Sequence, residues 1–192
     1  MFSINEFRSQ GLPWGGARSS LFDVECTFPP LPGANIPPQL GSFKIMATQL
    51  PAFVLGECQA PYFGRFIKFK GDRTFQDWTC HILNDEDFIL RNAFEAWQNG
   101  MNYMESNVMD PLFVANLYKA EMRVIQYAKD APPGSRMGNP LRDYTMVGAW
   151  PKIVSPINLD WSEQNRIESF EVTFAYDYFL IGGKTADFPT GF

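Results

Sequence analysis

Alternating apolar and polar side chains predict β-strands along most of this chain. A repeat of two residues is typical of a strand with one buried face. Eight segments fit a strand: residues 20–28, 42–50, 52–60, 64–71, 74–83, 120–130, 141–150 and 167–178. A short turn separates the third segment from the fourth, which predicts a long hairpin.

In three of these strands the alternation also assigns side chains to faces. In residues 42–50 one face holds Phe43, Ile45 and Ala47, and the other holds Lys44, Met46 and Thr48. In residues 74–83 the two sets are Trp78, Cys80 and Ile82 against Asp77, Thr79 and His81. In residues 167–178 they are Phe170, Val172, Phe174, Tyr176 and Tyr178 against Ser169, Glu171, Thr173, Ala175 and Asp177.

One segment has the period of a helix instead. Its apolar side chains fall on one helical face and are Ile89, Leu90, Ala93, Phe94 and Trp97. Asn84 is a suitable N-cap, and Asp87 would complete a capping box with it. The sequence predicts one α-helix from about residue 85 to 99, ending at Gly100.

Many strands and a single helix predict a mainly β fold, a β-barrel or sandwich with one packed α-helix. Proline removes backbone donors, so residues 29–41 are expected to form a loop, as are residues 131–140. We expect a single domain over residues 1–192, with an N-terminal arm at 1–18 and a C-terminal tail at 180–192. Residues 100–119 fit no clear pattern.

The charge composition of the chain argues against a surface that holds nucleic acid. The formal net charge is −5, whereas a surface built to hold nucleic acid usually clusters Lys and Arg. Three cysteines without a CxxC pair predict reduced thiols. The chain shows no signal peptide and no apolar run of about 18 residues, so we expect a soluble protein made inside the cell that does not enter a membrane. A high aromatic content, 16%, favours buried subunit contacts.

The most chemically crowded stretch, residues 71–87, holds the only histidine, His81, beside Cys80 and among five carboxylates. Neighbouring residues of a strand point to opposite faces, so these two side chains are not expected to share a metal ion or a proton. The acidic residues 85–87 fit the start of a helix, where carboxylates complement the helix dipole. We therefore expect no metal, no cofactor and no enzymatic activity.

Residues 65–73 are the one basic stretch interleaved with aromatic side chains, a pattern that some nucleic-acid-binding strands show. Phe66, Lys68 and Lys70 share one strand face, where lysine stems can lie along apolar surface. In a chain of negative net charge, the structural interpretation is favoured.

Seven short motifs resemble, in order and spacing, the tail tube proteins of contractile-tailed, T4-like bacteriophages. They are ATQLPA (47–52), GDRTFQDWT (71–79), LNDED (83–87), AFEAWQ (93–98), QYAKDA (126–131), GAWPKIVSPINLDW (148–161) and FEVTFAYDY (170–178). The resemblance implies six-membered rings that stack into a hollow tube within a contractile sheath and conduct the genome into the host. Related tubes occur in type VI secretion systems and contractile bacteriocins.

The resemblance also implies partners. They are other copies of the chain, the tail sheath protein, and baseplate and tail-terminator proteins. The tape-measure protein and genomic DNA would pass through the lumen without specific binding. The protein would be made in the host cytoplasm and end in the tail of the virion.

Two sets of residues acquire expected roles under this resemblance. Eight residues are expected to serve in turns, packing or assembly: Asp72, Arg73, Phe75, Trp78, Asn84, Trp97, Trp150 and Trp161. Gly71, Asp72 and Arg73 are predicted to turn the chain between two strands, with Arg73 paired to a carboxylate in its own or a neighbouring subunit. Lumen-facing positions are expected at Lys44, Thr48, Glu171, Thr173 and Asp177. An acidic or mixed lumen would keep phosphate from adhering.

Two alternatives remain open from the sequence. The chain could be a baseplate paralogue that initiates or caps a tube. It could also belong to another class, a monomeric β-barrel that binds a ligand among its aromatic side chains.

Overall fold

Strands are the predominant regular element in the part of the chain that the computed structural model describes: residues 3–12, 15–29, 44–111, 113, 117–130 and 138–182. The helical elements are α1 (Ile4–Glu6), the π-helical turn η1 (Phe7–Gly11) and α3 (Ile89–Met101). The strands are β1 (Phe22–Cys26), β2 (Ile45–Thr48), β3 (Phe53–Tyr62), β4 (Arg65–Phe75), β5 (Trp78–Leu83), β6 (Ala120–Tyr127), β7 (Pro140–Val154), β8 (Ser169–Ala175) and β9 (Tyr178–Gly182).

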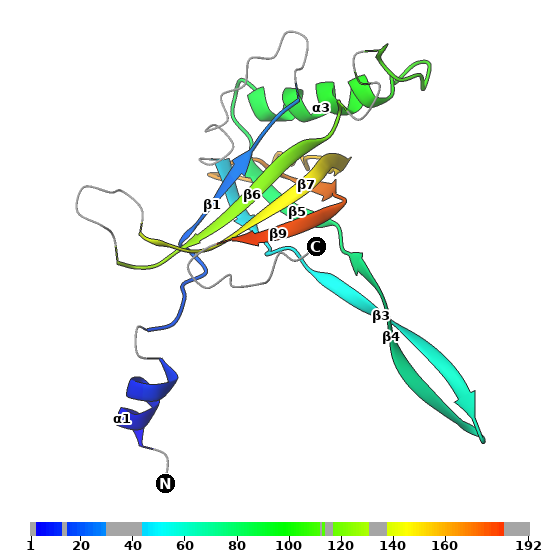
Figure 1. The fold of residues 1–192 in the computed structure, drawn as a ribbon. Coiled ribbons are helices and arrows are strands. Elements are labelled where there is room, and N and C mark those ends of the chain that lie inside the picture. Colours follow the sequence, from blue (N-terminus) through cyan, green and yellow to red (C-terminus); the bar gives the residue numbers. More distant parts are fainter. Residues whose placement is uncertain are drawn as a thin grey trace. The chain divides into compact units, whose positions relative to one another are not determined.

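The strands form two sheets (Figure 1). The larger has the order β1-β6-β7-β8-β5-β2, and β9 also pairs with β7. The smaller sheet is the hairpin of β3 and β4 alone. The pairs β2/β5, β5/β8, β7/β8 and β3/β4 are antiparallel. The prediction of a mainly β fold with one packed helix is confirmed.

The chain separates into two compact units. One comprises Met1–Asp23, Ile125–Asp143 and Ile181–Phe192, and the other comprises Val24–Val124 and Tyr144–Leu180. The second unit contains the whole of α3 and of the strands β2, β3, β4, β5 and β8. The single domain over 1–192 stays a prediction.

The core of the second unit lies between α3 and the strands β5 and β8. The alternation of β5 buries Trp78, Cys80 and Ile82, as the sequence predicts. Phe94 of α3 packs edge-on against Phe174 of β8, with ring centroids 5.8 Å apart, and Phe174 also contacts Trp78 at 5.4 Å. Burying an aromatic side chain removes about 150–250 Å² from water, so these contacts are a main source of stability.

Polar contacts fix α3 on this sheet. Arg91 donates to the carbonyl oxygen of Ser155 at 2.5 Å, and its guanidinium lies over the Phe170 ring at 5.2 Å. Gln98 donates to the carbonyl oxygen of Pro151 at 3.2 Å. The helix is therefore held by directional bonds at two positions as well as by its apolar face.

The predicted start of the helix is wrong by four residues. Asn84 does not cap it: its side chain donates to the Glu168 carboxylate at 3.0 Å, and its backbone N–H donates to the Glu168 carbonyl oxygen. Phe88 then adopts a left-handed conformation, φ 53°, which a helix cannot contain. Helix α3 begins at Ile89 and ends at Met101, so Gly100 lies inside it, beneath the Phe113 ring.

The predicted turn at Gly71, Asp72 and Arg73 is also wrong, because these residues lie within β4. The chain turns at Phe63 and Gly64, which both have positive φ, as a two-residue hairpin turn requires. Gly71 instead approaches Gly56 in β3, where the strand register shifts. A Cβ on Gly71 would lie 2.8 Å from the Gly56 carbonyl carbon, so only glycine fits there.

Two further strand predictions need correction. Strand β2 has a bulge between Ile45 and Ala47, so Ile45 is buried while Ala47 is exposed. The predicted final strand ends early: β8 stops at Ala175, and a separate strand, β9, begins at Tyr178. Tyr176 and Asp177 lie between the two strands. Tyr178 consequently leaves the buried face of Phe174 and is exposed.

The predicted arm and tail are only partly described. The N-terminal arm contains α1 and η1, and the predicted tail begins inside β9. The loop predicted at 29–41 lies outside the described residues from residue 30 onward, as do residues 131–137 and the tail beyond residue 182. Among the described residues, no helix combines the length and apolar character needed to cross a membrane.

Candidate functional site

Cys80 and His81 point to opposite faces of β5, as predicted. Cys80 is buried, and its thiol donates to the Val172 carbonyl oxygen at 3.8 Å. Burial, and secondarily the nearby Cys26 thiol, raises the pKa of Cys80, which disfavours a reactive thiolate. In the described part of the chain, no three His, Cys, Asp or Glu side chains lie close enough together to hold a metal ion.

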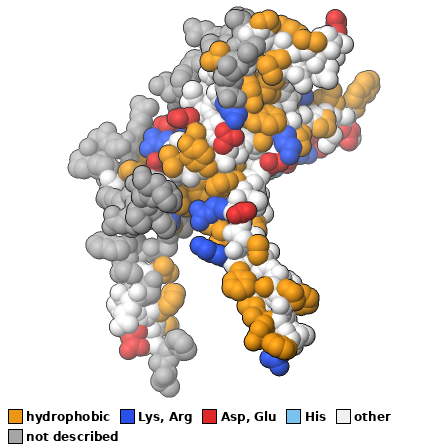
Figure 2. Space-filling model, turned by 45° about the vertical axis from the view of Figure 1, so that its right-hand side comes forward, with side chains coloured by type: hydrophobic (Ala, Val, Ile, Leu, Met, Phe, Trp, Pro, Cys, Tyr) orange, Lys and Arg blue, Asp and Glu red, His pale blue; other side chains and the backbone are white. Residues whose placement is uncertain are grey.

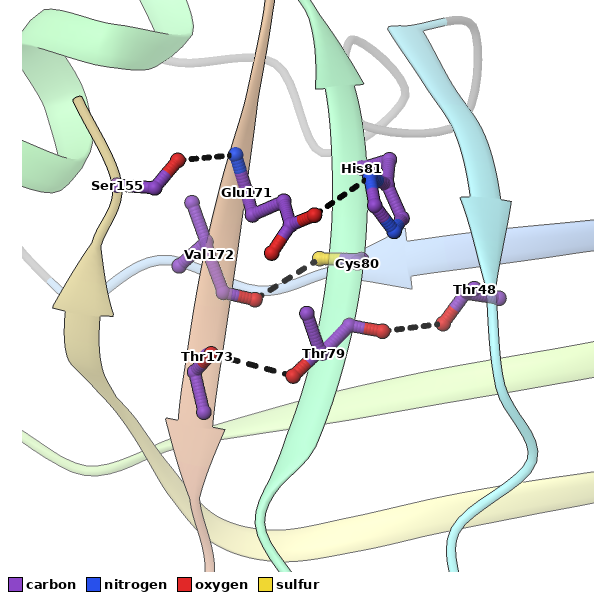
Figure 3. A network of polar contacts seen from close by, with 8 residues as sticks. All are labelled: Thr48, Thr79, Cys80, His81, Ser155, Glu171, Val172 and Thr173. Atoms are coloured by element: carbon purple, nitrogen blue, oxygen red, sulfur yellow. Dashed lines mark hydrogen bonds and ion pairs between the residues drawn. The ribbon is translucent and has the colours of Figure 1, made fainter. Parts of the chain in front are cut away.

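The face of β5 and β8 opposite Cys80 carries a row of polar contacts, which we call the polar face and define as Thr79, His81, Glu171 and Thr173 (Figure 3). His81 Nδ1 lies 3.2 Å from Glu171 Oε1. The hydroxyl groups of Thr79 and Thr173 are 3.1 Å apart, and Thr48 donates to the Thr79 carbonyl oxygen at 3.2 Å. Cross-strand pairs of this kind align neighbouring strands.

Two of the five predicted lumen residues, Glu171 and Thr173, therefore share one face. The other three lie elsewhere. Thr48 is paired with Cys80 across β2 and β5, so it points to the face of Cys80. Lys44 precedes β2 and pairs with Asp85 next to the start of α3. Asp177 follows β8 and pairs with Lys119 at 2.7 Å. Lys44 and Asp177 therefore form ion pairs away from the polar face.

The pair of Lys44 and Asp85 predicts a specific dependence of stability on pH. The hydrogen bond from Lys44 is the main cause that lowers the pKa of Asp85, whose carboxylate also accepts from the Ile89 N–H at 3.2 Å. A lowered pKa stabilises the fold above the ordinary value of about 4 and loses that effect as the pH falls through the folded-state value. We expect Lys44→Met to lower the urea midpoint near neutral pH and to match the wild type at about pH 2. An equal difference at every pH would contradict this.

The close approach of Gly148 and Asp177 predicts that a larger residue at position 148 destabilises the fold. Gly148 has φ +70°, and a Cβ there would lie 2.3 Å from the Asp177 carboxylate. Gly148→Ala is expected to destabilise the fold by about 1–3 kcal/mol through backbone strain and displacement of Asp177. Urea unfolding measures this, and Gly16→Ala is the control, because Gly16 is exposed and has nothing within 4 Å of its Cβ position. A loss no larger than that of the control would contradict the prediction.

The hairpin of β3 and β4 is the most exposed element of the second unit. Every residue of β3 is exposed, and in the space-filling view hydrophobic side chains line the hairpin with Lys and Arg at its tip and base (Figure 2). Strand pairing places Cys58, Ala60 and Tyr62 on the same face as Phe69, Ile67 and Arg65. Ile67 is 45% exposed, Phe69 is 55% exposed and the tip residue Phe63 is 91% exposed.

The root of this hairpin is well anchored. Phe53 and Phe75 both pack against Phe179 of β9, with ring centroids 5.9 and 5.5 Å apart. Arg73 lies over the Phe53 ring at 4.5 Å rather than against a carboxylate in the described part of the chain. The predicted packing role of Phe75 agrees with these contacts. The pairing of Arg73 with a carboxylate of a neighbouring subunit stays a prediction, and Asp72 is exposed on β4.

The four tryptophans assigned to packing or assembly differ in burial. Trp78 and Trp97 are buried, and their indole N–H groups donate to the carbonyl oxygens of Gln49 and Tyr118 at 2.7 and 2.8 Å. Trp150 is half-buried against Tyr118. Trp161 is fully exposed in the connection between β7 and β8, so it is not a core residue of the single chain.

The sequence did not identify the exposed apolar face of the hairpin. Phe63, Ile67 and Phe69 fit a half-buried strand equally well. The signal that could have identified it is the pair Gly56 and Gly71, because opposed glycines mark a close backbone approach and a strand pair without a packed face.

Comparison with known proteins complements this geometry. The sequence model described as "Phage tail tube protein" matches residues 17–182. Tail tube protein gp19 of Enterobacteria phage T4 is 35% identical over 162 residues, which cover 84% of this chain and 90% of that protein. Among solved structures, the anti-feeding prophage tube-terminating cap has a TM-score of 0.59 at 14% identity, over 88% of this chain and 92% of that chain. A chain in the sheath–tube complex of an extracellular contractile injection system has a TM-score of 0.53 at 14% identity, over 96% and 100%. These two structures share the fold.

Proposed function

The chain belongs to the phage tail tube protein family, and we propose that six copies form a ring and that rings stack into the inner tube of a contractile tail. The tube would serve as the conduit for DNA ejection. Its role would be structural, in the virion tail, after synthesis in the host cytoplasm. No enzymatic step is part of this function.

The exposed hairpin is the observation that carries the proposal. A two-stranded hairpin is at best marginally stable in water, and its strand edges can pair with other chains. An apolar face that includes Ile67 and Phe69 is costly to leave in solvent. Contact with neighbouring copies would cover this surface and stabilise the hairpin.

The polar face is our candidate for the channel wall. Thr79 and Thr173 are uncharged, and the His81 side chain lies against the Glu171 carboxylate. A wall of this kind offers phosphate few cationic contacts, so it would let DNA pass without retaining it. The tape-measure protein would pass along the same wall.

The proposed tube would have three further protein partners: the sheath, the baseplate and the terminator. A tube in a contractile tail must contact the sheath along its outside and meet baseplate and terminator proteins at its ends. A chain in the structure of the anti-feeding prophage tube-terminating cap shares the fold. The main tube role is favoured because the matched phage relative is named a tail tube protein.

Electron microscopy of the purified chain tests the proposal. We expect size-exclusion chromatography to separate monomers from large assemblies, and negative staining to show hollow six-fold rings or tubes. Addition of preformed tubes as seeds should increase the assembled fraction. A monomer that remains unassembled at high concentration, even with seeds, would contradict the proposal and favour a monomeric binding protein.

A further inference from the structure

The two ends of strands β5 and β8 carry different surfaces. Trp78 pairs with Phe174 at one end, and Leu83 pairs with Ser169 at the other. The hairpin leaves the sheet at the Trp78 end, since β4 finishes at Phe75. Residues 84–88 and 156–168 both lie at the Leu83 end, joined by the bonds between Asn84 and Glu168. We call these two segments the loop end.

The hairpin and the loop end have opposite charge. Residues 53–75 hold four Lys or Arg residues and two acidic residues. The loop end holds six acidic residues and one arginine, Arg166. Glu86 and Asp87 are exposed, and Arg166 is paired with Glu163 at 2.6 Å. In a chain of net charge −5, a locally basic element and a strongly acidic one thus lie at opposite ends of the same strands.

The loop end also presents apolar side chains to solvent. Trp161 is fully exposed, and Leu159 and Ile167 are mostly exposed. The turn beneath them is ordered, because the Asp160 carboxylate accepts from both the N–H and the hydroxyl of Ser162 at 2.8 and 2.7 Å. Exposed tryptophans held on ordered backbone are frequent anchors of protein interfaces.

We propose that the loop end is the docking surface for the hairpin of a second copy of this chain, with Trp161 as its main apolar contact. Charge complementarity and the placement of the two surfaces at opposite ends of the same strands support this occupant. A contact between two different patches of identical chains gives an open stack when its rotation does not close into a ring. The inference rests on the proposed function and names the contact between successive layers.

Replacing Trp161 with alanine tests this contact without disturbing the core, since the side chain is fully exposed. We expect Trp161→Ala to form single rings but to need an about ten-fold higher concentration to stack. Met104→Ala is the matched control, because Met104 is exposed but lies outside both surfaces. Trp161→Ala rings that stack at the wild-type concentration would overturn the inference.

Mixing two blocked variants tests the head-to-tail geometry. Trp161→Ala keeps an intact hairpin, and a variant with Ile67→Thr and Phe69→Thr keeps an intact loop end. At a concentration at which wild-type rings stack and Trp161→Ala rings do not, each variant alone should remain as single rings. A mixture should form particles of two layers, seen by electron microscopy and analytical ultracentrifugation. A mixture no larger than its components would contradict the contact.

The outcomes separate this inference from the proposed function. Wild-type chains that stack, together with Trp161→Ala chains that stack equally, overturn only the contact. Wild-type chains that form neither rings nor stacks, even when seeded, overturn the tube function and the contact with it.

Discussion

Replacing Ile67 and Phe69 with threonine is expected to abolish tube formation while changing the free energy of unfolding by no more than about 0.5 kcal/mol. Both side chains are exposed on the apolar face of the hairpin, opposite Ala60 and Cys58, so the isolated fold does not depend on them. Threonine keeps the strand preference while removing the apolar surface. Only contacts between chains should be lost.

Sedimentation and negative staining measure the loss of tubes, and urea unfolding of the monomer measures stability. Gln59→Thr is the control, because Gln59 lies on the opposite hairpin face, paired with Lys68. Tubes of normal length from the double variant would show that this apolar face is not used in assembly. A large loss of stability would show that the hairpin supports the fold of its own chain.

Trp97→Ala should destabilise the fold by about 3–5 kcal/mol, the cost typical of removing a large buried aromatic side chain. Trp97 is completely buried, contacts the Phe28 ring at 5.8 Å and donates to the Tyr118 carbonyl oxygen. Its removal leaves both a cavity beneath α3 and an unsatisfied carbonyl group. The measurement is urea unfolding at a concentration where the chain is monomeric.

Trp161→Ala is the matched control for Trp97→Ala. The same substitution at a fully exposed tryptophan should change stability by no more than about 0.5 kcal/mol. Similar losses at both positions would contradict the assignment of Trp97 to the core and Trp161 to an outer surface. The pair of variants thus separates folding from assembly.

Alternation along the sequence was sufficient to predict β5 and β8 and their buried faces. Trp78, Cys80 and Ile82 are buried, as are Phe170, Val172 and Phe174, because the side-chain period of a strand is independent of its partners. The helical face was equally predictable from Leu90, Ala93, Phe94 and Trp97. The motifs that resemble tail tube proteins also indicated the correct family.

Features that depend on distant partners could not be predicted. Asn84 has the right chemistry for an N-cap, but its side chain donates a hydrogen bond to the Glu168 carboxylate instead. The helix consequently begins at Ile89. Gly71 has the right chemistry for a turn, but it opposes Gly56 in a strand pair. The candidate lumen residues do not share one face for the same reason. Lys44 and Asp177 form ion pairs with Asp85 and Lys119, and the bulge in β2 pairs Thr48 with Cys80.

The most direct test of the account is a cryo-EM reconstruction of the assembled protein. We expect six-fold rings whose channel wall includes His81, Glu171 and Thr173, and whose hairpins are covered by neighbouring copies. An assembly with another symmetry, or with the polar face buried away from the channel and the hairpins free in solvent, would contradict it.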